Sequence, residues 1–223
     1  MPGHSEPLPM LCSGPVNEVR VSFERISKRF GARTVLASLS GSLDPGRVLV
    51  VAGPNGSGKS TLLNILAGAL RPSRGDVRYV EDRRELPRSR WFAHLGVAAP
   101  DMAVYDELSA AENLGFFARV RGLAVSAPFI TALLEEIGLP FREHGRSVGT
   151  YSSGMKQRVK LAQAVIHEPA VLLLDEPSSN LDAAGHEAVA RLVDRFRARA
   201  AVAVATNDPR EMAWGDARIE LAL

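Results

Sequence analysis

Hydrophobic and polar residues follow two different strand patterns in the first hundred residues. Residues 19–26 alternate apolar with polar side chains, which predicts an antiparallel strand with one exposed face. Similar stretches at 35–43 and 76–80 predict further strands. The run 48–52 is continuously apolar, as is typical of a parallel strand buried on both faces. This part of the chain is therefore expected to mix antiparallel strands with one parallel strand.

The apolar spacing becomes helical between residues 109 and 167. Ser109 and Glu112 form a capping-box pattern at the start of a first helix. A second helix is expected to begin near Pro128 and a third at Gly154. The apolar stripes of these helices are interpreted as core packing.

Strands and helices alternate in the last part of the chain. Apolar runs at 171–174 and 200–205 flank a helical stretch at 183–199, and residues 217–221 predict a final edge strand. Such alternation favours a parallel sheet between layers of helices. The sequence as a whole predicts the α/β class, with a mostly parallel core sheet.

The charge balance of the sequence bears on whether the protein binds nucleic acid. The 223 residues are 46% hydrophobic and 23% charged, and 27 Lys and Arg against 25 Asp and Glu leave a formal charge of +2. This balance does not favour a nucleic-acid partner, which usually requires a strongly basic face. The stretch 81–90 mixes arginines with acidic residues and is interpreted as a solvated hairpin or loop.

The N-terminal residues, the single cysteine and the lengths of the apolar runs indicate the cellular compartment in which the protein is expected. Residues 1–18, rich in proline as far as Pro15, are expected to be a disordered extension, and residues 19–223 a single domain. Cys12 alone cannot form an internal disulfide. No apolar run reaches the roughly 18–20 residues of a membrane span, and no signal-peptide pattern opens the chain. A cytoplasmic protein is therefore expected.

A glycine-rich loop joins the apolar run 48–52 to a helix-compatible segment. The loop consists of Gly53, Pro54, Asn55, Gly56, Ser57, Gly58, Lys59, Ser60 and Thr61, and fits G-x-x-x-x-G-K-[ST]. Its glycines let successive N–H groups approach an anion, and the N-terminus of the next helix adds partial positive charge. Lys59 is expected to reach the β- and γ-phosphates, and Ser60 to help hold Mg²⁺. The apolar run before the loop and the helix-compatible segment after it favour a phosphate-binding loop over a turn with a solvated lysine. The chain is therefore predicted to bind a nucleoside triphosphate.

Two acidic residues follow the apolar run 171–174. Asp175 is expected to hold Mg²⁺ directly or through water, and Glu176 to polarise an attacking water. The alternative is a surface turn, which the upstream phosphate loop makes less favourable. Asp175 and Glu176 therefore predict that the chain also hydrolyses the nucleoside triphosphate that it binds.

A second anion site is expected where Ser152, Ser153 and Gly154 open the third helix, since their N–H groups and hydroxyls face outward. By themselves these residues would be an ordinary helix cap. Two anion sites and one metal carboxylate in a small chain indicate that each chain supplies only part of a complete site.

In this order the motifs resemble the nucleotide-binding subunit of an ATP-binding cassette (ABC) transporter, in an exporter-like (haem-exporter-like or ABC-2-like) subgroup. The resemblance covers nearly all of residues 19–221. Residues 53–61 match the family's Walker A loop, and residues 171–176 match the Walker B strand with its catalytic Glu176. Residues 178–182 match the D-loop, which ends at Asp182, and residues 151–157 match a variant of the signature motif. Phe30 stands where the family has an aromatic that stacks on adenine, and its alternative is a Phe that packs at a turn.

The resemblance implies a P-loop NTPase fold with an antiparallel β subdomain and an inserted helical subdomain at about residues 100–168. It implies a head-to-tail homodimer or pseudo-dimer that holds ATP and Mg²⁺ between one chain's phosphate loop and the other chain's Ser152, Ser153 and Gly154. ATP would close this dimer, and hydrolysis would reopen it. The cycle would drive a separate transmembrane permease, which holds the chain at the inner face of the cell membrane.

Three positions depart from the family pattern. Pro100 stands where a glutamine usually contacts the metal, and proline cannot make that contact, although Asp101 could substitute. Asn207 stands at the switch-histidine position, and its amide can bond a γ-phosphate oxygen but cannot become a cation near neutral pH. Ser153 replaces the first signature glycine and adds a hydroxyl. These departures bear on the rate of hydrolysis.

Three functions are compatible with the sequence. The leading hypothesis is an ATPase subunit that energises a membrane exporter. A nucleotide-gated dimerisation module of low turnover is a second, which the presence of Glu176 disfavours. A non-transport cassette ATPase acting on ribosomes or DNA is a third, and that class usually carries tandem cassettes, coiled-coil insertions or zinc-binding cysteines.

Overall fold

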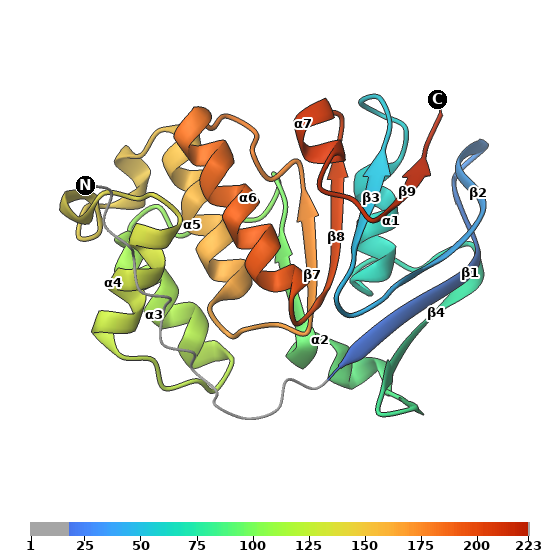
Figure 1. Ribbon diagram of the computed structural model, residues 1–223, viewed down its shortest axis with the longest axis horizontal. Coiled ribbons are helices and arrows are strands. Elements are labelled where there is room, and N and C mark those ends of the chain that lie inside the picture. Colours follow the sequence, from blue (N-terminus) through green and yellow to red (C-terminus); the bar gives the residue numbers. More distant parts are fainter. Residues whose placement is uncertain (1–17, 223) are drawn as a thin grey trace.

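Five parallel strands form the central sheet within residues 18–222, which the computed structural model describes (Figure 1). Their order across the sheet is β6 (Leu95–Ala98), β7 (Val171–Asp175), β8 (Ala201–Thr206), β3 (Val48–Ala52) and β9 (Ala217–Glu220). All neighbouring pairs run parallel, so the predicted parallel core is confirmed. β9 lies at one edge, as expected, whereas the sequence does not predict β6 at the other.

A second, antiparallel sheet has the strand order β2 (Arg33–Leu43), β1 (Val19–Phe30), β4 (Arg74–Glu81) and β5 (Arg84–Glu85). β1 pairs with both β2 and β4 and extends to Phe30, beyond the stretch that alternates in sequence. β4 and β5 form a hairpin, which confirms the interpretation of the arginine-rich stretch around Arg83.

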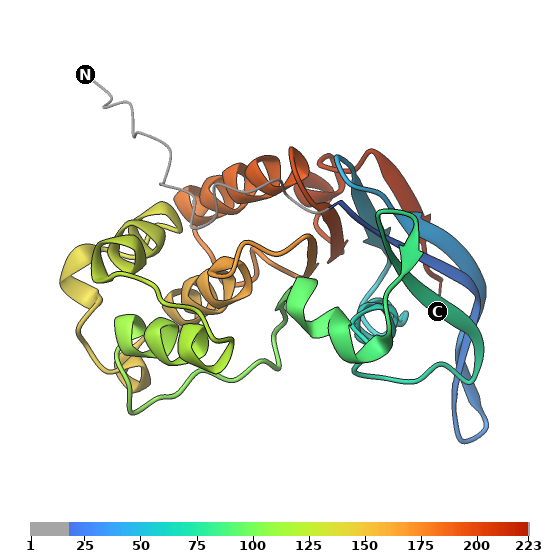
Figure 2. The same cartoon turned by 90° about the horizontal axis from the view of Figure 1, so that it is seen from below.

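The helices within residues 18–222 occupy both sides of the parallel sheet. They are α1 (Lys59–Leu66), α2 (Trp91–His94), α3 (Ala110–Val120), α4 (Ala127–Glu136), α5 (Ser153–Val165), α6 (Ala183–Arg197) and α7 (Pro209–Met212), with 3₁₀ turns at η1 (Arg88–Arg90), η2 (Phe141–Glu143) and η3 (Val148–Thr150). α3 to α6 gather on one side of the sheet, and α1 lies on the side of the antiparallel sheet (Figure 2).

Alternate residues of the central strands point into two separate cores. In β3, Val48 and Val50 pack with apolar residues of α3 to α6, whereas Leu49 and Val51 pack with α1 and the antiparallel sheet. Both faces of the strand are buried, which explains its continuously apolar sequence. Burial of each such side chain is worth roughly 1.5–3 kcal/mol.

Polar caps fix where two of the helices begin. Before α3, Ser109 Oγ accepts the N–H of Glu112 at 3.2 Å, and Glu112 Oε2 accepts the N–H of Ser109 at 2.8 Å, which confirms the capping box. Ser152 caps α5, so that helix starts at the exposed Ser153, one residue before the predicted Gly154. Loss of such a cap typically costs about 1 kcal/mol.

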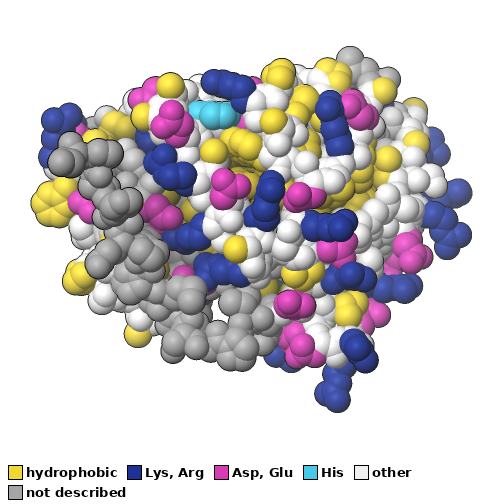
Figure 3. Space-filling view, viewed as in Figure 1, with side chains coloured by type: hydrophobic (Ala, Val, Ile, Leu, Met, Phe, Trp, Pro, Cys, Tyr) yellow, Lys and Arg dark blue, Asp and Glu magenta, His cyan; other side chains and the backbone are white. Residues whose placement is uncertain are grey.

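The N-terminal extension expected over residues 1–18 lies, apart from Glu18, outside the described residues. In the described part of the chain, no helix is both long and apolar enough to span a membrane. Basic and acidic side chains are interspersed over the face shown in Figure 3.

Candidate functional site

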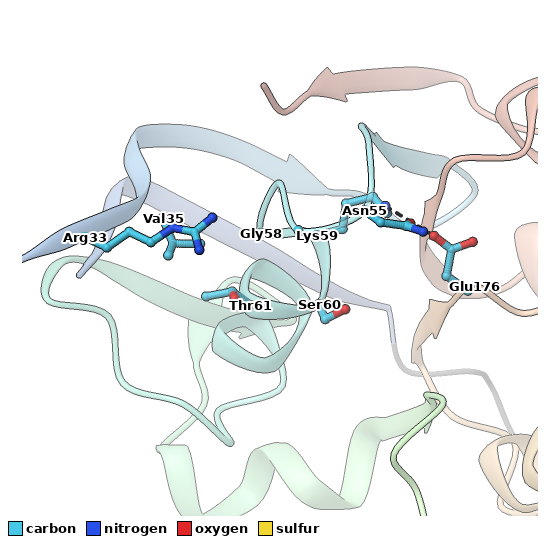
Figure 4. A pocket seen from close by; sticks show the side chains of 9 residues that line it. Arg33, Val35, Asn55, Gly58, Lys59, Ser60, Thr61 and Glu176 are labelled. Atoms are coloured by element: carbon cyan, nitrogen blue, oxygen red, sulfur yellow. Dashed lines mark ion pairs between the residues drawn. The ribbon is translucent and has the colours of Figure 1, made fainter. Parts of the chain in front are cut away.

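The loop between β3 and α1 forms one wall of a pocket of about 360 Å³. Gly58, with a φ of 102°, precedes α1 in a left-handed conformation that strains residues with a Cβ. A Cβ there would also lie 2.8 Å from Cγ1 of Val35, so the position requires glycine. The lining residues are Arg33, Val35, Asn55, Gly56, Gly58, Lys59, Ser60, Thr61 and Glu176 (Figure 4).

Lys59 is the buried cation of this pocket and is only 5% exposed. Its Nζ donates to the carbonyl oxygens of Gly53 at 2.8 Å and Pro54 at 3.3 Å, and lies 3.2 Å from Oε1 of Glu176. α1 begins at Lys59, so the free N–H groups of its first turn lie at the same end of the pocket. An anion entering here would meet both an ammonium group and a helix N-terminus.

Three of the predicted loop residues support the pocket without lining it. Gly53 and Pro54 hold Lys59 through their carbonyl oxygens. Ser57 is buried, and its N–H donates to the carbonyl oxygen of Pro54 at 3.2 Å, which closes the turn. The loop therefore acts through backbone shape as well as through the groups that face the pocket.

Asp175 ends β7 and is 4% exposed. Burial raises the pKa of its carboxyl group, a hydrogen bond from Ser60 lowers it, and the charge of Glu176 raises it. Oδ1 of Asp175 is buried and accepts no hydrogen bond. A buried free oxygen beside a hydroxyl fits a hard cation such as Mg²⁺. Within residues 18–222 no cluster of three or more His, Cys, Asp or Glu side chains could hold a metal.

Glu176 follows β7 in a left-handed backbone conformation, with a φ of 47°. Such a conformation costs about 1–3 kcal/mol for a residue with a Cβ and is typical of functional positions. Its N–H donates to the carbonyl oxygen of Ala205 at 2.8 Å, which fixes the turn to β8. The turn brings the carboxyl group to Lys59 at the pocket (Figure 4).

Asn207 follows β8, the strand next to β7. Its Nδ2 donates to Oδ1 of Asn55 at 2.9 Å. The predicted switch position therefore touches the phosphate loop, although Asn207 does not line the pocket itself.

Arg33 lines the pocket but belongs to none of the sequence motifs. It pairs with Phe30 across the β1–β2 turn, and its side chain points along the pocket towards Gly58 (Figure 4). Phe30 itself is 51% exposed and does not line the pocket, and Nζ of Lys28 lies 5.0 Å from its ring centroid. The sequence signal that could have revealed Arg33 is a basic residue in the same turn as the expected adenine-stacking ring.

Ser152, Gly154 and Asp182 lie together in a different pocket, of about 390 Å³. It shares no lining residue with the phosphate-loop pocket. A Cβ on Gly154 would lie 2.6 Å from the carbonyl oxygen of Asn180, so this position requires a glycine. Asp182 caps α6 and forms an ion pair with Arg158 at 2.8 Å. The structure thus groups Asp182 with the signature residues and separates both from the phosphate loop.

Two lysines of α5 anchor the loop that follows β6. Nζ of Lys160 donates to the carbonyl oxygen of Pro100 at 2.5 Å, and Nζ of Lys156 pairs with Asp106 at 2.7 Å. Burial lowers the pKa of Lys160, and the charge of the exposed Asp101 raises it. Pro100 therefore contributes a backbone oxygen, not a side chain, where the family pattern places a glutamine.

Comparisons with known proteins agree with this arrangement. The sequence matches the family described as "ABC transporter" over residues 36–179. It is 37% identical over 166 residues to the uncharacterized ABC transporter ATP-binding protein YhcH of Bacillus subtilis (strain 168), covering 74% of this chain and 53% of that protein. It is 34% identical over 192 residues to the cytochrome c biogenesis ATP-binding export protein CcmA of Brucella abortus (strain 2308), covering 86% of each.

The fold has counterparts among solved structures. The dimeric structure of MJ0796, a bacterial ABC transporter cassette, matches with a TM-score of 0.79 at 23% identity, covering 91% of this chain and 94% of that one. The fold class expected from the sequence is therefore confirmed. The chain spans about half the length of the first curated relatives that it matches.

Proposed function

The chain belongs to the ABC transporter ATP-binding family, and from this premise we propose that it is an ATPase subunit that energises a membrane transporter through ATP-driven dimerisation. The observation that carries this proposal is the separation of the phosphate-loop pocket from the pocket of Ser152, Gly154 and Asp182, which share no lining residue. Within one chain these half-sites do not enclose the same nucleotide. A head-to-tail pair of chains would bring each phosphate loop to the surface around Ser152, Gly154 and Asp182 of the other chain, which we call the signature surface.

Lys59 is the proposed phosphate ligand, and Glu176 the proposed general base. In the structure the two side chains lie 3.2 Å apart and partly neutralise each other. Phosphate oxygens would compete for the ammonium group and free the carboxylate of Glu176 to accept a proton from the attacking water. Its strained backbone holds it at the pocket in advance, so little reorganisation is needed.

Ser60 and Asp175 are the proposed protein ligands of Mg²⁺, which would neutralise charge on the phosphates. The free buried oxygen of Asp175 supports this assignment. Arg33 extends the positive wall of the pocket, where it would pair with phosphate oxygens, and Phe30 is proposed to stack on the adenine from the margin. Asn207 would offer its amide to the γ-phosphate after leaving Asn55.

The partner half-site is proposed to bind the same ATP from the other side. α5 has 13 residues, and its N-terminus carries the exposed Ser152 and Ser153. Hydroxyls and free N–H groups at a helix N-terminus stabilise an anion. We propose a homodimer or pseudo-dimer of this geometry, in which Asp182 shapes the surface by capping α6.

A membrane partner completes the proposal. The name of CcmA describes an ATP-binding export protein, which supports export as the direction of transport. The chain would act at the cytoplasmic face of the membrane, bound to a separate permease. Residues 19–223 are proposed to be one nucleotide-binding domain, and its helical part at about 100–168 the region that meets the permease.

Steady-state ATPase measurements on the chain and on Glu176→Gln test the enzymatic part. We expect turnover to fall at least about 100-fold, because the amide cannot take the proton, while an ATP-stabilised dimer persists. Glu187→Gln, an exposed change on α6 whose ion pair to Arg191 is 4.0 Å long, is the matched control. Equally slow turnover of the chain and of Glu176→Gln would overturn the proposal in favour of a low-turnover dimerisation module.

Affinity purification of the chain from membranes tests the transport part. Recovery with an integral membrane protein is the expected result. Recovery with ribosomes or DNA instead would favour a non-transport ATPase.

A further inference from the structure

Glu211, on α7, lies four positions after Asn207 and is almost completely buried, with 2% of its surface exposed. Its Oε1 accepts the N–H of Ser178 at 3.0 Å. Its Oε2 is buried and accepts no hydrogen bond, and Oγ of Ser178 is also buried without a partner. Burial of a carboxyl group with half of its hydrogen bonds unmade is costly, so a purely structural role is a poor explanation.

The residues around Glu211 connect it to the switch position. Asp208 caps α7 by accepting the N–H of Arg210 at 2.8 Å, and its own N–H donates to Oγ1 of Thr206 at 2.9 Å. The end of β8, Asn207 and α7 are therefore one short bonded unit. A change at Asn207 would move Glu211 with it, because few rotatable groups lie between them.

The residues around Ser178 connect the same contact to the signature surface. The carbonyl oxygen of Pro177 accepts a hydrogen bond from Nε2 of Gln157 on α5 at 3.0 Å. The carbonyl oxygen of Asn180 lies against Gly154, where no Cβ would fit. The stretch 177–182 therefore contacts α7 through Ser178 and lies against the N-terminal part of α5 through Pro177 and Asn180.

We propose that Glu211 is a positioning residue that couples the nucleotide in the chain's own pocket to the signature surface it offers to the partner's nucleotide. This rests on the proposed function, since it presupposes a dimer with two ATP sites. Two unpartnered buried atoms on residues already in contact give the coupling a physical basis. A small shift of the segment 178–182 would let the Ser178 hydroxyl donate to Oε2 of Glu211 and satisfy both atoms at once. ATP at the switch position selects that second arrangement.

Three variants of the full chain separate the contacts involved. Ser178→Ala removes the hydroxyl and keeps the backbone N–H, so the existing hydrogen bond to Glu211 survives. Glu211→Gln keeps an oxygen for that N–H and replaces the second acceptor with an uncharged NH2 group, to which the Ser178 hydroxyl cannot donate. Glu211→Ala removes both. Glu220→Gln, an exposed change on β9 that breaks only an ion pair to Arg218, is the matched control.

The readouts are the dissociation constant of a fluorescent ATP analogue, the Hill coefficient for ATP in the ATPase assay, and the turnover at saturating ATP. For Ser178→Ala and Glu211→Gln we expect a dissociation constant within about twofold of the unaltered chain, a Hill coefficient that falls from about 2 towards 1, and turnover reduced about tenfold. Glu211→Ala should show the same or a larger loss.

Unchanged Hill coefficients in folded Ser178→Ala and Glu211→Gln would overturn the inference. A weaker binding of ATP to the isolated chain, with cooperativity retained, would also overturn it, because it would assign Glu211 to its own pocket. If Glu211→Ala does not fold, the other two variants decide. If the unaltered chain itself shows neither ATP-driven dimerisation nor cooperativity, the proposed function fails first, and that result is distinct from a loss confined to the variants.

Discussion

Protonation of His167 is expected to weaken the fold in acid. Its Nε2 lies 3.0 Å from the carbonyl oxygen of Leu95 at the start of β6, and because a carbonyl can only accept, Nε2 carries the proton. Nδ1 is buried without a hydrogen-bond partner. Burial lowers the pKa of His167 to about 3, and the positive charge of Arg121 adds to the effect.

The sign follows from comparing the folded and unfolded chains. Above pH 6.5, the ordinary pKa of histidine, His167 is neutral in both states and adds no pH dependence. Below it, the unfolded chain binds a proton that the folded chain refuses until about pH 3, so the free energy of unfolding falls with pH across this window. At 1.36 kcal/mol per pH unit, the loss reaches about 2 kcal/mol at pH 5.

Urea unfolding at pH 7.5 and pH 5 measures this loss. His167→Gln can still donate an amide hydrogen to Leu95 but cannot be protonated, so we expect it to lose about 2 kcal/mol less than the unaltered chain between the two pH values. His144→Gln is the matched control, since His144 is also buried with Nε2 2.9 Å from a backbone carbonyl oxygen. The same pH dependence in His167→Gln and in the unaltered chain would refute the reasoning.

Two further predictions concern the half-sites. Arg33→Ala should weaken ATP binding about 10- to 100-fold in a fluorescence titration, because a charge-assisted contact is worth about 1.5–3 kcal/mol. An unchanged affinity would show that Arg33 is not part of the site. The control is Arg29→Ala, since Arg29 does not line the pocket. Gly154→Ala should abolish the ATP-dependent dimer in sedimentation velocity while the chain still binds ATP, because its Cβ would lie 2.6 Å from the carbonyl oxygen of Asn180. Gly145→Ala meets nothing within 4 Å and should dimerise normally, and a normal dimer of Gly154→Ala would contradict the assignment.

Local patterns were sufficient wherever a single segment determines its own structure. The continuous apolar run of β3 follows from burial on two faces by two cores, and the capping box of α3 involves residues three positions apart. Lys59, Asp175 and Glu176 lie in one region because β3 and β7, which have only β8 between them, run parallel and end at the same edge of the sheet. The apolar run and the capping box could be predicted because the pattern and its physical cause lie in the same stretch of chain, and the grouping of the three site residues because each follows an apolar run that predicts a buried parallel strand.

Features that depend on contacts between distant segments could not be predicted in this way. β6 has four residues, too few for a pattern, and is a strand because β7 pairs with it from Leu95 to Ala98. Arg33 reaches the pocket because the start of β2 passes the residue before α1, where Val35 lies next to Gly58, and its sequence does not indicate this. The contact of Glu211 with Ser178 joins residues 33 positions apart. Each of these required the tertiary arrangement, and two of them bear directly on the site.

The groups that would face the γ-phosphate are already paired within the chain. Lys59 donates to two loop carbonyls and contacts Glu176, and Asn207 donates to Asn55. ATP binding would therefore exchange internal contacts for phosphate contacts, and the net gain per neutral hydrogen bond is about 0.5–1.5 kcal/mol rather than its gross strength. The gain is larger for Lys59, whose ammonium group exchanges carbonyls for a polyanion, than for Asn207, whose amide stays neutral. On the proposed function, the affinity for ATP would therefore come mainly from the phosphate loop, and Asn207 would help to position the γ-phosphate. That contribution would not vary with pH near neutrality, because an amide does not titrate there.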